Sequence, residues 1–559
     1  MGKIYLNRLE SYLLVSFLTL VVMPILYILR FLDDNTLTSW RWVFTGTSPV
    51  ILFLYLMPLL LLAVWLSRSA IPDRYPSLFL FSAGFVTAAF LWNEPEMLLD
   101  ASRYFLQAKY FSENGLGFFL KEWGHAIAPW TDLPLMPFLY GLLFKLFGEF
   151  RFAVQVLNSL LFALSLVLTC HVGKILWDDE TGFHAGLLLL GIPYLPTQVP
   201  LMLVDIGTMF FMVLTVFTFI KSMQQGGPLW LGVSAISIVC ALSVKFSTWP
   251  MLAGVLPIIA GVHLRKRPAV IIRRALIITI SAAILWSVLF FSKYDVIREQ
   301  MVILGTFQRE GLKRWQEGYI STFFFQIHPF ITMAALYGIY RAVRNRDIRF
   351  LVAACCIGFV FPLQIKRIRY ILPLLPLVTL MAAYGLNGIR DPALKRFCSY
   401  CAVLSAMVVL FGGYKPFLQR TSMMNLKEAG QYLNTLPFDT VDVLLLPQHE
   451  SAGSTAAVLP ILDLYTSRQL RLSRQWPELS PENQSKKSSS LRFTWELTRP
   501  PFYPLAEPNG TNPLLIISSR DPFELPNQMV QQKNKGSVEK FYQQSQVFRY
   551  RTIVTVLSP

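Results

Sequence analysis

The sequence predicts an all-α polytopic membrane protein with about thirteen transmembrane helices, followed by a C-terminal extracytoplasmic α/β domain. Three observations lead to this prediction. Hydrophobic residues make up 54% of the 559 residues and charged residues only 15%, against roughly a quarter in ordinary soluble domains. Apolar runs long enough to cross a bilayer recur from residue 11 to residue 413. Beyond residue 413 the chain changes to polar and Pro-rich segments between short apolar runs.

The first apolar run, 12–29, follows Lys3 and Arg8, and no small-residue cleavage site comes after it. It is therefore predicted to be an uncleaved first span with a cytoplasmic N-terminus. The stretch 134–148 is short and bounded by Pro and Gly, so we expect a helix at the outer membrane face instead of a crossing. The predicted spans are 11–30, 49–66, 77–92, 152–174, 184–202, 206–221, 229–245, 249–262, 271–291, 323–340, 349–364, 371–388 and 397–413.

The basic residues set the orientation. With the N-terminus inside, the connectors 263–274, 341–349 and 389–396 face the cytoplasm, and they are the densest basic connectors in the chain. This agrees with the positive-inside rule, in which the acidic connector 177–180 counts little. A multi-pass protein of a bacterial inner or plasma membrane is the expected setting. The segments predicted to lie outside are 93–133, 292–322 and 414–559.

The net charge of +17 would suggest nucleic-acid binding in a soluble protein, but cytoplasmic loop cations explain most of it here. We therefore expect no nucleic-acid partner. The cysteines show no pair of CxxC units and are interpreted as core residues. They are Cys170, Cys240, Cys355, Cys356, Cys398 and Cys401.

Basic residues on the outer side need another explanation. Lys366, Arg367 and Arg369 lie between two apolar runs in "VFPLQIKRIRYILPLLPL", residues 360–377, and the outer loop 292–322 carries further cations. An anionic ligand would account for them. Contact with lipid phosphates is the simpler alternative.

The tail is predicted to form a second unit, so that residues 1–413 are the transmembrane domain and 414–559 a soluble α/β domain. Strand-like runs begin at residues 441, 513 and 546. A helical pattern before the first run places Leu426, Ala429 and Leu433 on one face.

Isolated charges beside apolar runs are the candidate functional residues. Asp100, followed by Arg103 and Tyr104, enters the long outer loop 93–133, where it is either a functional carboxylate or a solvated acid. Asp205 is the sole charge between two apolar runs, either as a functional acid or as a helix N-cap. Lys245 lies between spans near the outer side, where it either extends to the interface or binds a phosphate.

The order of these motifs resembles the GT-C glycosyltransferases that use polyprenyl-phosphate sugars, in particular the protein O-mannosyltransferase and lipid A aminoarabinose transferase families. The resemblance spans roughly 93–388. It rests on shared order more than on any single motif. The motifs are "DASRY" (100–104), "WTDLPLMPFLYGLLFKLFG" (130–148), "VD" (204–205), "SVKF" (243–246) and "KRIRYILPLLP" (366–376).

The resemblance implies that Asp100 is the catalytic carboxylate at the outer face and Asp205 a second acid of the site. It places the basic group before "YILPLLP" near the lipid phosphate. The implied activity is an inverting hexosyl- or pentosyltransferase with a polyprenyl-phosphate sugar donor and a hydroxyl or phosphate acceptor on lipid, glycan or protein. Two departures stand out: Asp132 and Leu133 replace the usual Lys–Pro, and two additional spans precede the catalytic loop.

The residue types suit this chemistry. Asp100 could activate an acceptor hydroxyl, and the outer cations, including Lys245, could stabilise a leaving phosphate. Nothing in the sequence requires a cofactor. A divalent metal stays open, because His125 and His328 lie in or beside outer loops, although a lone His is more often structural. The alternatives are a transporter or flippase for an anionic or lipid-linked substrate and a membrane scaffold that presents the tail.

Overall fold

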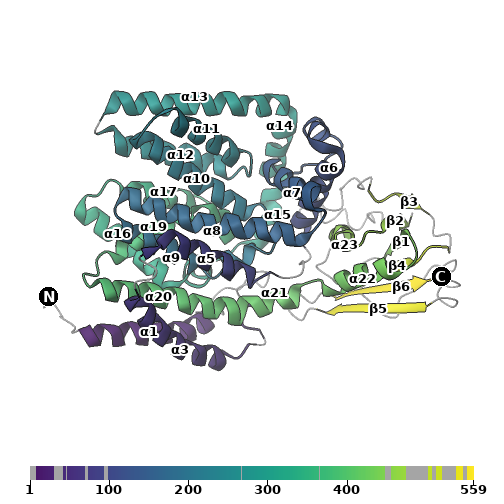
Figure 1. The fold of residues 1–559 in the computed structure, drawn as a ribbon, viewed down its shortest axis with the longest axis horizontal. Helices are drawn as coiled ribbons and strands as arrows, with labels where there is room; N and C mark the ends of the chain where they lie inside the picture. The colour runs from purple at the N-terminus through teal and green to yellow at the C-terminus, as the bar shows by residue number, and fades with distance from the viewer. Residues whose placement is uncertain are drawn as a thin grey trace.

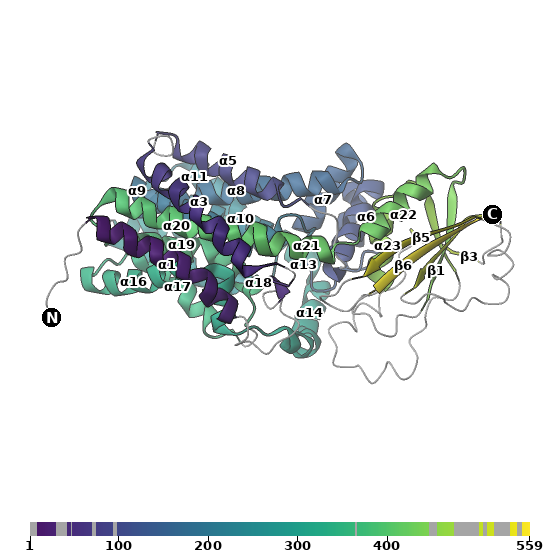
Figure 2. The same cartoon turned by 90° about the horizontal axis from the view of Figure 1, so that it is seen from below.

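The computed structural model describes residues 8–29, 42–45, 47–69, 74–92, 98–265, 267–363, 366–446, 455–473, 502–506, 511–518, 537–544 and 551–559. It is a bundle of long helices with a small sheet at one end. Helix α1 (Arg8–Leu29), the first described element, begins at the opposite end (Figures 1 and 2).

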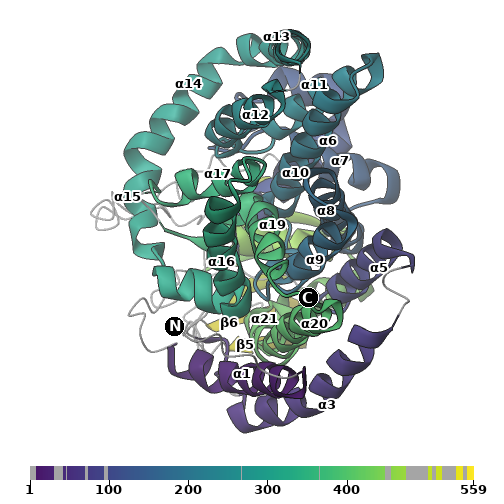
Figure 3. The same ribbon diagram turned by 90° about the vertical axis from the view of Figure 1, so that its left-hand side faces the viewer.

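Most helices of the first half follow the predicted spans, with the exception of span 184–202. The paired helices α1 and α3 lie at one edge of the bundle beside α20 (Figure 3). The bounds are α1 Arg8–Leu29, α3 Pro49–Arg68, α5 Pro76–Ala89, α6 Leu99–Glu122, α7 Leu135–Phe147, α8 Arg151–Leu176, α9 Asp179–Leu190, the 3-10 helix η1 Leu195–Gln198, α10 Asp205–Gln224, α11 Pro228–Leu242, α12 Thr248–Leu264 and α13 Pro268–Ser292.

The second half contains more breaks. Its elements are α14 Tyr294–Ile303, η2 Leu304–Gln308, α15 Arg309–Leu312, η3 Lys313–Trp315, η4 Ser321–Ile327, α16 Pro329–Asn345, α17 Phe350–Val360, α18 Ile368–Ile371, η5 Leu372–Leu374, α19 Leu375–Leu386, α20 Pro392–Val409, η6 Leu410–Tyr414 and α21 Lys415–Thr421.

The protein is a multi-pass membrane protein. Within the described residues, 7 helices are long and apolar enough to cross a membrane, or up to 8 if one bent pair counts as a span. Shorter apolar helices, α5, α11, α12 and α17, occupy other predicted spans, and α7 is the predicted surface helix. The number of crossings therefore stays a prediction.

The predicted span 184–202 is wrong in its second half. Helix α9 ends at Leu190, and the chain continues through 191–204 as irregular backbone and η1, buried throughout. Pro193, Pro196 and Pro200 explain the break, because proline lacks an N–H and clashes with the preceding helical turn.

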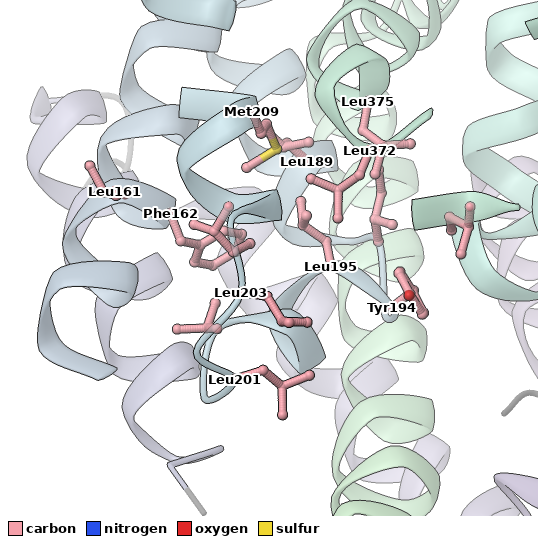
Figure 4. Close-up of a cluster of buried hydrophobic side chains, with 14 of the residues drawn as sticks. Leu161, Phe162, Leu189, Tyr194, Leu195, Leu201, Leu203, Met209, Leu372 and Leu375 are labelled. Carbon is pink, nitrogen blue, oxygen red and sulfur yellow. The ribbon is translucent and has the colours of Figure 1, made fainter. Parts of the chain in front are cut away.

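This buried segment is held by apolar packing and by hydrogen bonds to its backbone. Leu195, Leu201 and Leu203 lie among side chains of α8, α9, α10 and η5 (Figure 4). Asn158 donates to the carbonyls of Val199 (3.2 Å) and Leu201 (2.9 Å). Non-helical backbone at membrane depth is tolerated only where protein groups satisfy it. The segment delivers the chain to Asp205.

The predicted span 323–340 is also not a single helix. It is broken into η4 and α16, which are bent by 118°. His328 lies at the break with φ 145°, and Pro329 follows it. Its Nδ1 accepts from the N–H of Phe330 (3.3 Å), and its Nε2 contacts the Ser405 hydroxyl (3.0 Å). The ring therefore stabilises the bend.

The connectors predicted to share the inner side meet at one end. Arg8 pairs with Asp391 at 3.0 Å, and Trp177 donates to Asp347 at 3.1 Å. Helices α6 and α14, in segments predicted outside, lie toward the other end of the bundle, the end that carries the sheet (Figures 1 and 2). The structure thus groups the connectors as expected. Which end faces the cytoplasm stays a prediction.

The tail contains a six-stranded mixed sheet of order β3-β2-β1-β4-β6-β5. Strands β3, β2, β1 and β4 are parallel, and β6 pairs antiparallel with β4 and β5. The bounds are β1 Thr440–Leu445, β2 Gln469–Ser473, β3 Leu505–Ala506, β4 Leu514–Ser518, β5 Ser537–Gln544 and β6 Arg551–Ser558; the helices are α22 Met424–Thr435 and α23 Thr455–Asp463.

The three predicted strands correspond to β1, β4 and β6, although residues 546–550 lie outside the described residues. Leu426, Ala429 and Leu433 of α22 are fully buried, as their spacing predicted. Helices α20 and α21 form one apolar helical stretch, Pro392–Thr421. It passes through the predicted domain boundary at 413, which stays a prediction.

Candidate functional site

Arg369 joins two carboxylates that are far apart in the sequence. Its Nε donates to Oδ2 of Asp205 at 2.7 Å, and its Nη1 donates to Oδ2 of Asp100 at 2.7 Å. Asp100 lies in the first turn of α6, Asp205 is the first residue of α10, and Arg369 belongs to α18. Three elements therefore converge on one guanidinium.

Asp205 is enclosed. Its side chain is 1% exposed, and Oδ1 accepts from Nζ of Lys245 at 2.7 Å. The N-cap of α10 is Val204, without a side-chain bond, so the alternative that Asp205 caps the helix is wrong. The carboxylate instead holds two cations from different segments, which suits a positioning role.

Asp100 is the more accessible carboxylate, at 32% side-chain exposure. Its Oδ1 lies 3.0 Å from Nη2 of Arg103, one helical turn along α6. Arg103 also donates through Nε to Asp132 at 3.1 Å, and Tyr104 donates its hydroxyl to Asp132 at 3.0 Å. Asp132, which departs from the family pattern, thus anchors Arg103 beside Asp100.

Close packing of α7 holds α6 in place. A Cβ on Gly141 of α7 would lie 2.7 Å from the carbonyl oxygen of Ala108 on α6. Real Cβ atoms do not come this close, so only glycine permits this approach. Helix α7, which follows the loop that carries Asp132, is thereby held against α6 at Ala108.

The electrostatics keep Asp100 ionised. Burial raises its pKa, but the positive charges of Arg103 and Arg369, with a smaller effect of Arg367, outweigh burial and hold the pKa well below its usual value. Burial and the negative charges of Asp132 and Asp100 raise the pKa of Tyr104 well above its usual value. Tyr104 is therefore a neutral hydrogen-bond donor at neutral pH.

The other predicted cations lie just before Arg369. Nζ of Lys366 lies 3.9 Å above the centre of the Tyr319 ring, and the Arg367 guanidinium lies 5.4 Å from that of Trp315. Such cation–π contacts fix a side chain while leaving its charge available to an anion. Of the four predicted phosphate-binding residues, Lys245 and Arg369 contact the two carboxylates directly, and Arg367 lies close enough for its charge to act on Asp100. Lys366 is held at the Tyr319 ring, and its role in binding phosphate stays a prediction.

The charges of this site are nearly balanced. The three aspartates of the site, Asp100, Asp132 and Asp205, are matched in number by three cations, Arg103, Lys245 and Arg369. Two further positive charges come from Lys366 and Arg367. Glu317, which sequence reasoning missed, is the one further acid bonded to this segment in the described residues. One positive charge remains in excess, which favours an anion.

The metal hypothesis gains no support from the two histidines. His328 is buried and takes part in the α16 bend, and His125 lies in the turn after α6. In the described part of the chain, no group of three or more His, Cys, Asp or Glu side chains could hold a metal ion.

Comparison with known proteins identifies the fold. ArnT from Cupriavidus metallidurans bound to undecaprenyl phosphate is similar over 86% of this chain and 98% of its own, with a TM-score of 0.56 and 13% identity. Its apo structure gives a TM-score of 0.54, 14% identity and coverages of 87% and 98%. A weaker match is AglB from Archaeoglobus fulgidus in complex with an inhibitory peptide and a dolichol-phosphate. It has a TM-score of 0.46 and 12% identity, and the match covers 80% of this chain and 70% of that one.

No protein-family model and no curated protein matches the sequence. The likeness to ArnT shows that the chain has the GT-C fold, as the motif order predicted. At this level of identity the likeness concerns the fold alone.

Proposed function

We propose that this protein is a membrane glycosyltransferase that moves a sugar from a polyprenyl phosphate to a hydroxyl or phosphate acceptor at the outer membrane face. The observation that carries the proposal is the Asp100–Arg369–Asp205 bridge, flanked by Lys245, in a fold shared with a protein solved with undecaprenyl phosphate. Buried charges are costly unless they serve one another or a ligand.

The donor supplies its own leaving group. The acceptor oxygen attacks C1 of the sugar, the bond from C1 to the phosphate oxygen breaks, and the phosphate departs with the electron pair. Arg369 suits the stabilisation of that charge, because a guanidinium has five N–H donors and the two ion pairs leave donor capacity for phosphate. An acceptor hydroxyl would lose its proton to Asp100.

Donor binding and base strength are coupled in this arrangement. Two arginines lower the pKa of Asp100, which makes it a weak base while both ion pairs are formed. A phosphate that draws Arg369 toward itself weakens the ion pair with Asp100. The pKa of Asp100 then rises toward the value that base catalysis needs. Donor binding thus increases the strength of the base that the reaction needs.

A transfer assay tests the proposal. The detergent-purified full chain is incubated with radiolabelled polyprenyl-phosphate sugars and cell-envelope fractions, and we expect label to move into an envelope component. The matched control is Asp100→Asn, which keeps size while losing the base. Label that stays on every donor, together with lipid movement across vesicles by the same preparation, would establish the transporter alternative instead.

A further inference from the structure

We infer that Glu317, with the rings of Trp315 and Tyr319, is the positioning unit that fixes the basic segment 366–368, and through it Arg369, for the donor phosphate. This inference rests on the proposed function, and it adds residues of the outer loop 292–322 to the site.

Glu317 holds the basic segment at two points. Its backbone N–H donates to the carbonyl of Lys366 at 2.7 Å, and its Oε2 accepts from the N–H of Ile368 at 2.8 Å. Its Oε1 accepts from the Gln326 side chain at 3.3 Å. At 7% exposure, the carboxylate is fixed on both oxygens and is poorly placed to react. It is therefore a positioning residue.

The aromatic rings lie two residues to either side of Glu317. The Tyr319 ring lies beneath Lys366, and the Trp315 ring lies beneath Arg367. With the bond from Ile368 to Glu317, every residue of the segment 366–368 is therefore contacted by a residue of the segment 315–319. Between Trp315 and Glu317, Gln316 has an extended backbone (φ −63°, ψ 135°), and Arg367 in the basic segment is extended as well (φ −151°, ψ 131°).

The consequence reaches Arg369 directly. Ile368, bonded to Glu317, is 0% exposed and immediately precedes Arg369. A shift of Ile368 would move the guanidinium away from Asp100 and Asp205. Since binding a phosphate by several fixed donors depends on their preorganisation, loss of this clamp should weaken donor binding more than it slows the chemical step.

The experiment measures undecaprenyl phosphate binding to the full chain, together with donor KM, acceptor KM and kcat. We expect Glu317→Ala to raise the donor KM and the dissociation constant about 10-fold or more, since a lost bond to a charged group is large. We expect kcat and acceptor KM to change less than about threefold. Glu317→Gln keeps an acceptor oxygen for Ile368 and should restore much of the loss.

Tyr319 supplies an independent arm with a matched control. Tyr319→Leu removes the ring and should weaken binding by about 2- to 30-fold, whereas Tyr319→Phe keeps the ring and should bind like wild type. The inference would be overturned if Glu317→Ala and Tyr319→Leu both bound the donor as tightly as wild type does. Transfer by the wild-type protein would still support the proposed function in that case. A fall in kcat alone, or equal losses for Tyr319→Leu and Tyr319→Phe, would also overturn it. Absence of transfer by wild type would refute the function itself.

Discussion

Helix α6 carries two ion-pair clusters of opposite character. At its start, Asp100 and Arg103 belong to the proposed site, where cations exceed acids by one. At its middle, Lys109 bonds Asp463 of α23 at 2.7 Å and lies 3.4 Å from Glu149. The Tyr503 hydroxyl also donates to Asp463, at 2.8 Å. This second cluster, which we call the junction, joins α6 to the tail.

The junction has an excess of negative charge. Lys109 faces two carboxylates, with Glu113 a third nearby. Burial lowers the pKa of Lys109, but Asp463 and Glu149 outweigh it and raise the pKa. Burial raises the pKa of Glu149 and of Glu113. The junction should therefore repel an anion, whereas the proposed site at the start of α6 should attract one. It follows that a cluster of buried charges does not by itself identify a ligand site.

The largest expected difference between the clusters concerns catalysis. Asp100→Asn should reduce transfer by about 100-fold or more, because the amide cannot accept the acceptor proton. The measurement is kcat with a saturating labelled donor. Asp463→Asn in the junction is the matched control and should stay within a few-fold of wild type. Equal activity of Asp100→Asn and wild type would remove Asp100 from the mechanism.

Donor binding should separate the clusters next. Arg369→Ala removes a charged bond donor, so we expect the donor KM to rise by about 10- to 100-fold, with some fall in kcat. Lys109→Met removes a comparably buried cation from the junction and should leave donor KM unchanged. If both variants raised donor KM alike, the charge comparison between the two clusters would be wrong.

The same Lys109→Met variant should instead lose stability. It leaves Asp463, at 9% side-chain exposure, without its cation, and breaking a buried pair costs about 3–5 kcal/mol. A lowered temperature of thermal unfolding in detergent is the expected result. The pKa of Lys109 is higher in the folded protein than in the unfolded chain, so charged Lys109 stabilises the fold at pH values below its usual pKa. The difference in unfolding temperature between wild type and Lys109→Met should therefore disappear as pH rises through the folded-state pKa.

The pH dependence gives the smallest and most specific effect. The folded-state pKa of Asp100 is lowered, so its ion pairs are complete above the usual value and are lost as pH falls through the folded value. The acid limb of the kcat/KM profile reports the free enzyme and should therefore lie below about pH 4. The acid limb of the kcat profile reports the complex with the donor, in which the pKa of Asp100 is higher, and should lie at higher pH. Coincident limbs would contradict the coupling between donor binding and Asp100.

Sequence patterns predicted what depends on local order. The apolar runs located the helices, and isolated charges beside them located Asp100, Asp205, Lys245 and Arg369. Local sequence patterns could not predict that the Arg369 guanidinium joins two of these acids, because Arg369 and Asp100 are 269 residues apart in the sequence.

The misses have physical causes of the same kind. The 191–204 break requires knowing that Asn158 satisfies the freed carbonyls, although three prolines in 193–200 were a usable signal. Glu317 lies in a charged loop where nothing local distinguishes it, since its partner Ile368 is 51 residues away. Strands β2 and β3 are short, and the described side chains of β5 are mostly exposed, so none of the three has a strong apolar run.

The central claim is that Arg369 exchanges a carboxylate partner for the donor phosphate. A cryo-electron microscopy map of the full chain in nanodiscs with undecaprenyl phosphate tests it most directly. We expect the phosphate to contact the Arg369 guanidinium and the Asp100 pair to lengthen from 2.7 Å. A phosphate bound elsewhere, with Arg369 still joined to both carboxylates, would contradict the account.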